Sequence, residues 1–338
     1  MTAARLHDVS ETELLQRLFP LFEGTTGRAQ VLLGPGDDAA VLAAPSGSVV
    51  LTTDSMVRGR DWHDHWSSPE EVGHKVAVQN LADIAAMGAV PTGLLVALAA
   101  DPATEVDWAL ALAGGIASAA AEAGAPVLGG DLSSAGEGSV VVGITAIGDL
   151  GGRPAVRRDG ARPGDLVAVL GTLGHSGGGL QLLLDGRGRT HLDPPLDAGA
   201  DEDAVAVDLL CRAHRRTAGV PWRAGAEAAD AGATAMIDLS DGLVRDLGRV
   251  ATASGVRVDL DPEALQEAAA GPLTRALGPQ EALRQVLSGG EEHSLLATFD
   301  PGEVPAGWRV VGRCAPGPAQ VLLEGQVPEA IGWDHFAG

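Results

Sequence analysis

Two adjacent aspartates near the start of the chain have the residue type and the spacing of a metal site. Asp37 and Asp38 follow a short apolar run, and glycines on both sides of Pro35 let the backbone bend so that both carboxylates can converge on one ligand. Like charges held this close repel each other unless a cation lies between them. Carboxylate oxygens are hard ligands that suit Mg²⁺. The stretch therefore favours a magnesium site, although a polar turn between two hairpin strands explains the same residues.

Further oxygen donors follow other apolar runs. Thr52, Thr53 and Asp54 come directly after the run that ends at Leu51, and Asp131 follows a run that ends in two glycines. We expect both groups at the ends of strands, because a strand end presents a carboxylate to a crevice rather than burying it. Aspartate and threonine oxygens together again suit Mg²⁺.

A helix over residues 69–87 must position another polar pair. Ser68 and Glu71 form a capping box at its start. Asn80 and Asp83 are three residues apart, so they share one surface of this helix. An unpaired buried charge is costly, so this pair among apolar residues favours a metal-facing position over a solvent-exposed helix edge.

The second half of the chain repeats the pattern. An apolar run at 235–237 leads into Asp238, Ser240 and Asp241, and a helix is expected at 244–253. A helix cap accounts for one of the two carboxylates, whereas a metal site accounts for both.

A glycine- and proline-containing stretch at 151–154 predicts a boundary between two domains, residues 1–150 and 151–338. A hydrophobic content of 45% with 47 glycines and 20 prolines fits a turn-rich α/β (α+β) protein. The densest positive patch of the chain follows the boundary, and it consists of Arg157, Arg158 and Arg162. Arginines at such a junction can bind phosphates, with a solvated linker as the alternative.

The composition limits the partners. The net charge of -22 argues against nucleic acid and against anionic membrane surfaces. An anionic substrate would therefore approach through metal ions or local arginines. The two cysteines fit no metal spacing and lie far apart in the sequence, which predicts a reducing cytoplasm. No apolar stretch is long enough to span a bilayer, and the N-terminus shows no signal core.

The acidic residues share one pattern, in which an apolar run or helix and small residues accompany the acid. Together they predict one acidic cleft that draws on both halves of the chain and is neutralised by several divalent cations. No Gly-Lys-Ser/Thr sequence of a P-loop is present, which points to a nucleoside triphosphate held through metal ions. The acids are Asp37, Asp38, Asp54, Asp83, Asp131, Asp238 and Asp241.

The chain resembles the thiamine-monophosphate kinases, in the superfamily that includes aminoimidazole ribonucleotide synthetase. The matching motifs occur in the family's order and cover nearly the whole chain. They are Gly36-Asp37-Asp38-Ala39-Ala40, Thr52-Thr53-Asp54, residues 79–89, Gly129-Gly130-Asp131, Arg162-Pro163-Gly164-Asp165, residues 238–243, Gly289-Gly290-Glu291 and Gly332-Trp333-Asp334-His335-Phe336.

The resemblance implies two α/β domains in a synthetase-like fold. The N-terminal domain would carry a mixed sheet that forms a β-barrel with a second subunit, and ATP would bind in a cleft completed by the C-terminal domain. Several Mg²⁺ ions would be bound by Asp38, Thr52, Thr53, Asp54, Asp83, Asp131, Asp238 and Asp241. The predicted ATP contacts are Gly130, Asp131, Arg158 and Ser240.

The resemblance also implies the acceptor, thiamine monophosphate. Glu291 and Trp333 would contact its thiamine moiety. The carboxylate would lie near the cationic thiazolium, and the aromatic ring would stack on it. Relatives usually carry His-Phe where this chain has Asp61-Trp62, so either Asp61 or His63 contacts the substrate. The residues after Glu291 also depart from the family's Gly-Gly-Glu-Asp-Tyr-Glu.

The implied reaction is the direct in-line transfer of the γ-phosphate of ATP, which gives thiamine diphosphate. The acceptor phosphate is largely a dianion at neutral pH, because its second pKa is about 6, so no residue is needed as a general base. Asp54, Asp83 and Asp131 would act by positioning metal ions. The alternatives are a sister enzyme of the superfamily with another acceptor, and a non-catalytic nucleotide- or metal-sensing homologue.

Overall fold

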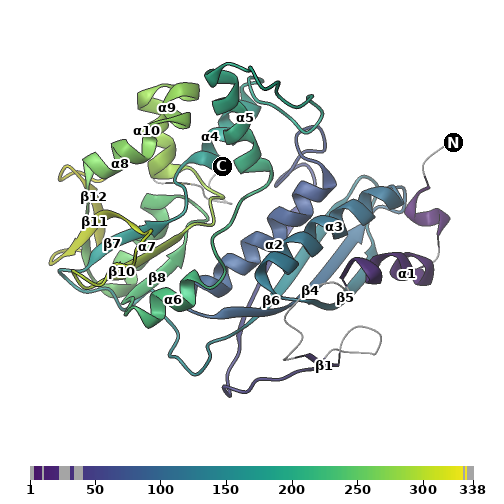
Figure 1. Cartoon of the computed structure of the whole chain (residues 1–338), viewed down its shortest axis with the longest axis horizontal. Coiled ribbons are helices and arrows are strands. Elements are labelled where there is room, and N and C mark those ends of the chain that lie inside the picture. Colours follow the sequence, from purple (N-terminus) through teal and green to yellow (C-terminus); the bar gives the residue numbers. More distant parts are fainter. Residues whose placement is uncertain (1–3, 10, 23–30, 34–40, 330–331, 333–338) are drawn as a thin grey trace. The chain divides into compact units, whose positions relative to one another are not determined.

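The computed structural model describes residues 4–9, 11–22, 31–33, 41–329 and 332 (Figure 1). The chain forms two compact units. Unit 1 comprises Met1–Ile84 and Val90–Gly152, and unit 2 comprises Ala85–Ala89 and Arg153–Gly338.

A four-stranded sheet forms the centre of unit 1. Its strands lie in the order β3 (Val50–Val57), β6 (Val140–Asp149), β4 (Val90–Ala100) and β5 (Val127–Ser134). The first three are antiparallel neighbours, whereas β4 and β5 are parallel. A parallel pair needs a long crossover, which here contains a helix. The mixed sheet predicted for the N-terminal half is confirmed.

Two helices lie side by side over one face of this sheet, α2 (Pro69–Ala86) and α3 (Val106–Ala123) (Figure 1). Their backbones approach closely, because Gly73 of α2 and Gly115 of α3 each lie against the backbone of the other helix. On the other face of the sheet, Leu51 and Leu95 are exposed.

The remaining elements of unit 1 are short or peripheral. Helix α1 (Glu11–Phe22) packs against α3 through Leu14 and Leu18. The others are the 3-10 helix η1 (Leu6–Asp8) and the strand pair β1 (Val31–Leu33) and β2 (Val41–Leu42).

Unit 2 is built on a six-stranded sheet in the order β12-β9-β11-β7-β10-β8. Neighbouring strands are antiparallel except β12 and β9. The strands are β7 (Leu166–Leu170), β8 (Ala235–Asp238), β9 (Arg257–Leu260), β10 (Leu295–Phe299), β11 (Arg309–Ala315) and β12 (Gln320–Leu323). Strand β10 is buried along its whole length, and the Phe299 ring meets Trp308 edge-on.

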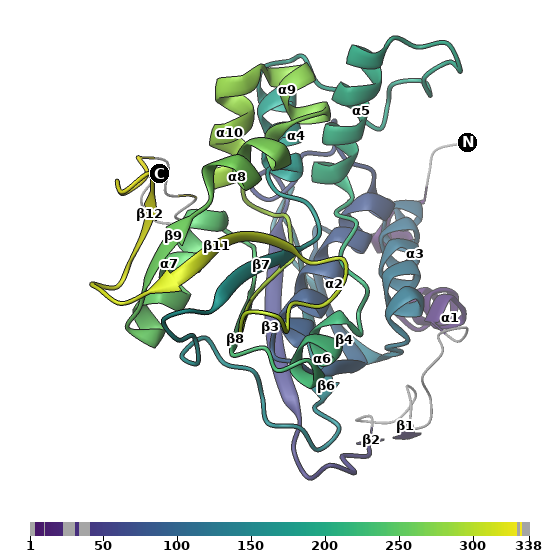
Figure 2. The ribbon, with the colours of Figure 1, turned by 60° about the vertical axis from the view of Figure 1, so that its left-hand side comes forward.

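Seven helices surround this sheet in the described part of the chain. They are α4 (His175–Leu184), α5 (Glu202–Arg215), α6 (Ala224–Asp230), α7 (Leu243–Ser254), α8 (Pro262–Ala269), α9 (Pro272–Leu277) and α10 (Pro279–Ser288). Of these, α4, α8, α9 and α10 gather at one end of the sheet (Figure 2). No helix among the described residues is long and apolar enough to cross a membrane.

Candidate functional site

The helix-covered face of the unit 1 sheet brings together several of the predicted site residues. The Thr52 hydroxyl of β3 donates a hydrogen bond to Asp83 Oδ2 of α2 at 2.7 Å. Two residues along the strand, the Asp54 backbone N–H donates to Asn80 Oδ1 at 2.9 Å. Asn80 is fully buried and its amide also donates to the Val76 carbonyl of its own helix. Asn80 therefore ties α2 to β3, and it explains why a polar residue lies among the apolar residues of this helix.

The prediction that Thr52, Thr53 and Asp54 lie at a strand end is wrong. Strand β3 continues to Val57, so all three residues belong to its interior. Because side chains alternate along a strand, Thr53 faces away from Thr52 and Asp54. On that opposite face, the Thr53 hydroxyl accepts a hydrogen bond from Thr145 Oγ1 at 3.1 Å.

Asp131 is likewise inside a strand, since β5 continues to Ser134. Its neighbour Leu132 packs into the cluster that contains α3, so Asp131 and Ser133 lie on the other, open face. There the Ser133 hydroxyl donates to Asp131 Oδ2 at 2.8 Å. Gly130 lies against β4, where a Cβ would be 1.8 Å from the Val96 carbonyl oxygen. The structure thus places Thr52, Asp54 and Asp83 on the helix-covered face of the sheet, with Thr52 and Asp83 in contact, and it places Thr53 and Asp131 on the opposite face.

In unit 2, Asp238 is the last residue of β8 and is almost completely buried. Its Oδ2 lies 3.2 Å from Nδ1 of the buried His293. Burial removes the water that hydrates a carboxylate in the unfolded chain. A buried carboxylate therefore needs a hydrogen-bond partner such as this one to compensate. His293 therefore fixes the orientation of one of the predicted metal ligands.

Asp241 follows β8 and is held by positive charge from α7. Its carboxylate pairs with Arg249 and lies 3.7 Å from Arg245. Behind it, the fully buried Asp246 accepts hydrogen bonds from the backbone N–H groups of Asp241 and Gly242 at 2.9 and 3.2 Å. Burial raises the pKa of Asp246 to about 6. Sequence reasoning missed Asp246 and also missed that Arg249 pairs with both Asp241 and Asp246.

The segment that contains Glu291 is fixed to the end of β8. The Glu291 N–H donates to the Ser240 carbonyl at 2.7 Å, and the His293 N–H donates to the Leu239 carbonyl at 2.9 Å. Both Glu291 and His293 have positive φ angles, 60° and 51°. Such values are uncommon for residues other than glycine and call for a local reason. Here the reason is that the side chains of successive residues in this segment contact different secondary-structure elements, and these contacts hold the backbone in the unusual conformation.

Glu292 anchors the same segment to the start of α4. Its carboxylate accepts from the Thr172 hydroxyl at 2.5 Å and from the Ser176 N–H at 2.7 Å, near the positive end of the helix dipole. Burial raises the pKa of Glu292, opposed by these hydrogen bonds. The departure from the family motif after Glu291 is therefore accommodated by specific contacts.

The Glu291 side chain itself meets a residue that sequence reasoning missed. Its Oε2 lies 3.2 Å from Nδ1 of His214, in the last turn of α5. No local sequence signal connects these two residues, because their contact depends on how α5 packs in unit 2.

The loop after β3 contains the predicted substrate residue Asp61. Its Oδ2 accepts a hydrogen bond from the Val57 N–H at 2.7 Å, which closes the turn at the end of β3. His63 instead forms an aromatic cluster with His65 and Trp66, with ring centroids 5.4 and 4.5 Å away. Asp61 therefore has a structural partner within its own loop, and His63 belongs to a group of rings.

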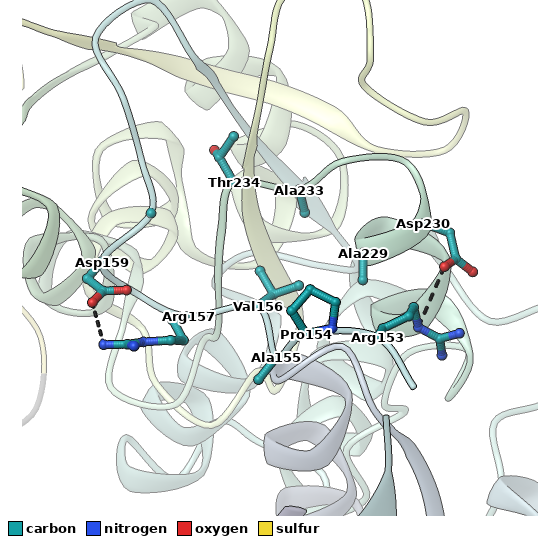
Figure 3. A pocket seen from close by; sticks show the side chains of 11 residues that line it. Arg153, Pro154, Ala155, Val156, Arg157, Asp159, Ala229, Asp230, Ala233 and Thr234 are labelled. Atoms are coloured by element: carbon teal, nitrogen blue, oxygen red, sulfur yellow. Dashed lines mark hydrogen bonds and ion pairs between the residues drawn. The ribbon is translucent and has the colours of Figure 1, made fainter. Parts of the chain in front are cut away.

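Unit 2 also contains a pocket of about 500 Å³, and two of its lining residues, Arg157 and Asp159, are the chain neighbours of the predicted ATP contact Arg158 (Figure 3). Two arginines line it, and both are paired, Arg157 with Asp159 and Arg153 with Asp230 (Figure 3). Arg158 itself is exposed, and its carbonyl accepts from the Ser254 hydroxyl at 2.8 Å. The predicted residues Asp37, Asp38 and Trp333 lie outside the described residues.

The donor set on the helix-covered face of unit 1 fits a hard divalent cation, since all its side-chain ligands are oxygens. Asp241 fits less directly, because two arginines already compensate its charge. Among the described residues, no three or more His, Cys, Asp or Glu side chains are grouped closely enough to hold a metal ion by themselves.

Comparison with known proteins identifies the family. Residues 36–150 match the AIR synthase related protein, N-terminal domain. The thiamine-monophosphate kinase of Mycobacterium tuberculosis is 42% identical over 336 residues, covering 98% of this chain and 92% of the relative.

Solved structures agree with this match. The thiamine-monophosphate kinase of Stenotrophomonas maltophilia K279a superposes with a TM-score of 0.79 at 28% identity, covering 95% of this chain and 98% of that one. A structure of AaThiL complexed with AMPPCP and TMP gives a TM-score of 0.70 at 26% identity, covering 99% and 100%. The resemblance and the fold class inferred from the sequence are confirmed: the chain belongs to the thiamine-monophosphate kinase family of enzymes.

Proposed function

We propose that this protein transfers the γ-phosphate of ATP to thiamine monophosphate and so forms thiamine diphosphate. The observation that carries the proposal is the 42% identity to a thiamine-monophosphate kinase across 98% of the chain. The similarity to a structure that holds AMPPCP and TMP supports the same pair of substrates.

We assign Mg²⁺ binding first to Thr52, Asp54 and Asp83, whose oxygens share one face of the unit 1 sheet. The 2.7 Å bond between Thr52 and Asp83 supports this assignment, as does the Asn80 contact that fixes α2 to β3. Bound Mg²⁺ would neutralise and orient the phosphates of the two anionic substrates. The task of the protein residues is to hold these oxygens in a fixed arrangement before the ligands arrive.

We also propose the other predicted residues as metal ligands, although several of them can bind a metal ion only under further conditions. Thr53 and Asp131 would need a second binding surface, because they face away from Asp54. Asp241 would exchange its arginine partners for a metal ion, and His293 would keep Asp238 oriented. Asp37 and Asp38 complete the proposed set.

The nucleotide and the acceptor are assigned to different residues. We assign ATP contacts to Gly130, Asp131, Arg158 and Ser240. For the acceptor we assign Glu291 and Trp333, and we favour His63 over Asp61, because the Asp61 carboxylate is engaged by the Val57 backbone.

The transfer proceeds directly, without a phosphoenzyme and without a general base. The acceptor is a phosphate monoester that is largely a dianion at neutral pH. The enzyme therefore only has to align it with the γ-phosphate. Direct transfer predicts inversion at a chirally labelled γ-phosphorus, and retention would contradict it.

We also propose that the protein acts as a homodimer through unit 1, in a reducing cytoplasm. The exposed apolar side chains on the open face of the sheet support the first point, with Leu51 exposed by 62% and Leu95 by 37%. The two buried, free cysteines support the second. Sedimentation of the wild type and of Leu51→Glu tests the dimer: the wild type should sediment as a dimer and the variant as a monomer.

The proposed function is tested by incubating the pure protein with ATP, Mg²⁺ and thiamine monophosphate, and separating the products by chromatography. We expect thiamine diphosphate and ADP in equal amounts. Thiamine diphosphate that is absent while ATP still binds would favour a sensing homologue, and turnover only with a different acceptor would favour a sister enzyme.

A further inference from the structure

We propose that His214 is a positioning residue that holds the carboxylate of Glu291 in place for the cationic acceptor. The inference rests on the proposed function, which assigns Glu291 to the thiamine moiety. It adds a residue from a distant helix, α5, to the acceptor side of the site.

The contact is buried on one side and open on the other. Only 5% of His214 is exposed, and its Nδ1 lies 3.2 Å from Glu291 Oε2. The same nitrogen lies 3.3 Å from the Ser176 hydroxyl at the start of α4, and Ser176 is also buried. The Glu291 side chain is 35% exposed, so a ligand can reach it while His214 holds it from the protein side.

The backbone of Glu291 is held in place as well. Its φ angle of 60° is one that residues with a side chain rarely adopt. Its N–H donates to the Ser240 carbonyl, and its carbonyl accepts from the Thr217 hydroxyl at 3.4 Å. An unusual conformation persists only where its surroundings enforce it, and such positions concentrate at ligand sites. Backbone and side chain together therefore fix one direction for the carboxylate.

A carboxylate can only accept, so the 3.2 Å contact requires an imidazole that donates its Nδ1–H to Glu291. A neutral donor orients the carboxylate and leaves its negative charge available to a thiazolium cation. A protonated ring would instead compensate that charge and repel the cation. Ser176 then shares the same N–H as a second acceptor or directs its own hydroxyl elsewhere.

His214 also packs against α4, because a Cβ on Gly179 of that helix would come within 3.0 Å of the His214 Cβ. A substitution that removes its volume would therefore disturb the α4–α5 contact as well as the hydrogen bond. The test must separate these two effects.

Two amide variants do so. In His214→Asn the side-chain N–H replaces Nδ1, the atom that faces Glu291, whereas in His214→Gln it replaces Nε2. Initial rates with ATP and thiamine monophosphate varied in turn give both KM values and kcat. We expect H214Q to raise the KM for thiamine monophosphate roughly tenfold, the size typical of losing a hydrogen bond to a charged group. The KM for ATP and kcat should change less than about threefold, and H214N should remain within about threefold of the wild type in all three.

The double variant H214Q/E291Q provides a second measurement, which asks whether the two substitutions affect the KM through the same contact. If His214 acts through Glu291, adding H214Q to Glu291→Gln should raise the KM for thiamine monophosphate little further. Near-UV circular dichroism checks that each variant keeps its tertiary packing.

Several results would overturn the inference. The inference is wrong if H214Q and H214N weaken the binding of both substrates equally, or if H214Q leaves the KM for thiamine monophosphate unchanged. It is also wrong if the two substitutions act independently in the double variant. A wild type that forms no thiamine diphosphate refutes the proposed function instead, so the two failures are distinguishable.

Discussion

Two adjacent glycines of α3, Gly114 and Gly115, should respond in opposite directions to the same substitution. A Cβ on Gly115 would lie 1.9 Å from the Glu70 carbonyl oxygen and 2.8 Å from the His74 nitrogen, both backbone atoms of α2. A Cβ on Gly114 would meet nothing within 4 Å. The pair therefore separates the effect of helix contact from the effect of helix propensity.

The magnitudes follow from this geometry. In Gly115→Ala, α2 and α3 must separate until the contact grows from 1.9 Å to the 3.4 Å at which ordinary contact begins. Overpacking costs about 3 kcal/mol at the upper end of its usual range, and we take this upper value because the clashing atoms belong to the backbone. The higher helix propensity of alanine offsets about 1 kcal/mol of this cost. The net loss is about 2 kcal/mol, whereas Gly114→Ala should gain about 0.5–1 kcal/mol.

Thermal unfolding followed by circular dichroism measures both effects. At roughly 3 °C per kcal/mol, G115A should lower the Tm by about 6 °C and G114A should raise it by about 2 °C. Because α2 carries Asn80 and Asp83, G115A should also raise the Mg²⁺ concentration that gives half-maximal activity. If G115A were as stable as G114A, the close approach of α2 and α3 would be wrong.

Three further outcomes are expected. Asp54→Ala should abolish turnover and leave the Tm within about 2 °C of the wild type, since a partly buried carboxylate without a folding role contributes little stability; near-normal activity would contradict the metal assignment. His63→Ala should raise the KM for thiamine monophosphate, whereas Asp61→Asn, which keeps an acceptor for the Val57 N–H, should leave it nearly unchanged; the reverse order would assign the contact to Asp61. Burial raises the pKa of Cys211, and it raises the pKa of Cys314 to about 12. Both thiols therefore stay protonated at pH 8 and should react with a thiol reagent only after unfolding. The stability that the raised pKa of Cys314 gives to the folded protein is fully present below the ordinary pKa of a thiol, and it is lost as the pH rises through about 12. Rapid labelling of the native protein would show that the cysteines are accessible.

Local signals predicted the elements well where one motif determines the conformation. The start of α2 is an example, since Ser68 and Glu71 form both hydrogen bonds of the predicted capping box, at 2.9 and 3.2 Å. The helix and its polar pair followed from the same short stretch, because Asn80 and Asp83 needed only helical spacing to share a surface.

Strand ends were predicted less well. Polar residues such as Thr53 and Asp131 suggested turns, but a sheet with an open face accepts polar side chains in the middle of a strand. Strand propensity depends on which face a residue occupies, and that is known only once the sheet is assembled.

Contacts between distant segments could not be predicted from local patterns. The approach of His214 to Glu291 depends on the packing of α5 against α4, and the His293–Asp238 pair depends on how β10 aligns with β8. The family motif predicted that Glu291 matters, but only the fold shows which residue holds it.

The most direct test of the proposed reaction follows the γ-phosphoryl group itself. The pure protein is incubated with Mg²⁺, thiamine monophosphate and ATP whose γ-phosphoryl oxygens are ¹⁸O-labelled, and the products are analysed by mass spectrometry. We predict that the label appears in the terminal phosphoryl group of thiamine diphosphate at the rate at which ADP forms. Label released only as inorganic phosphate, with no labelled thiamine diphosphate, would contradict the proposed kinase activity.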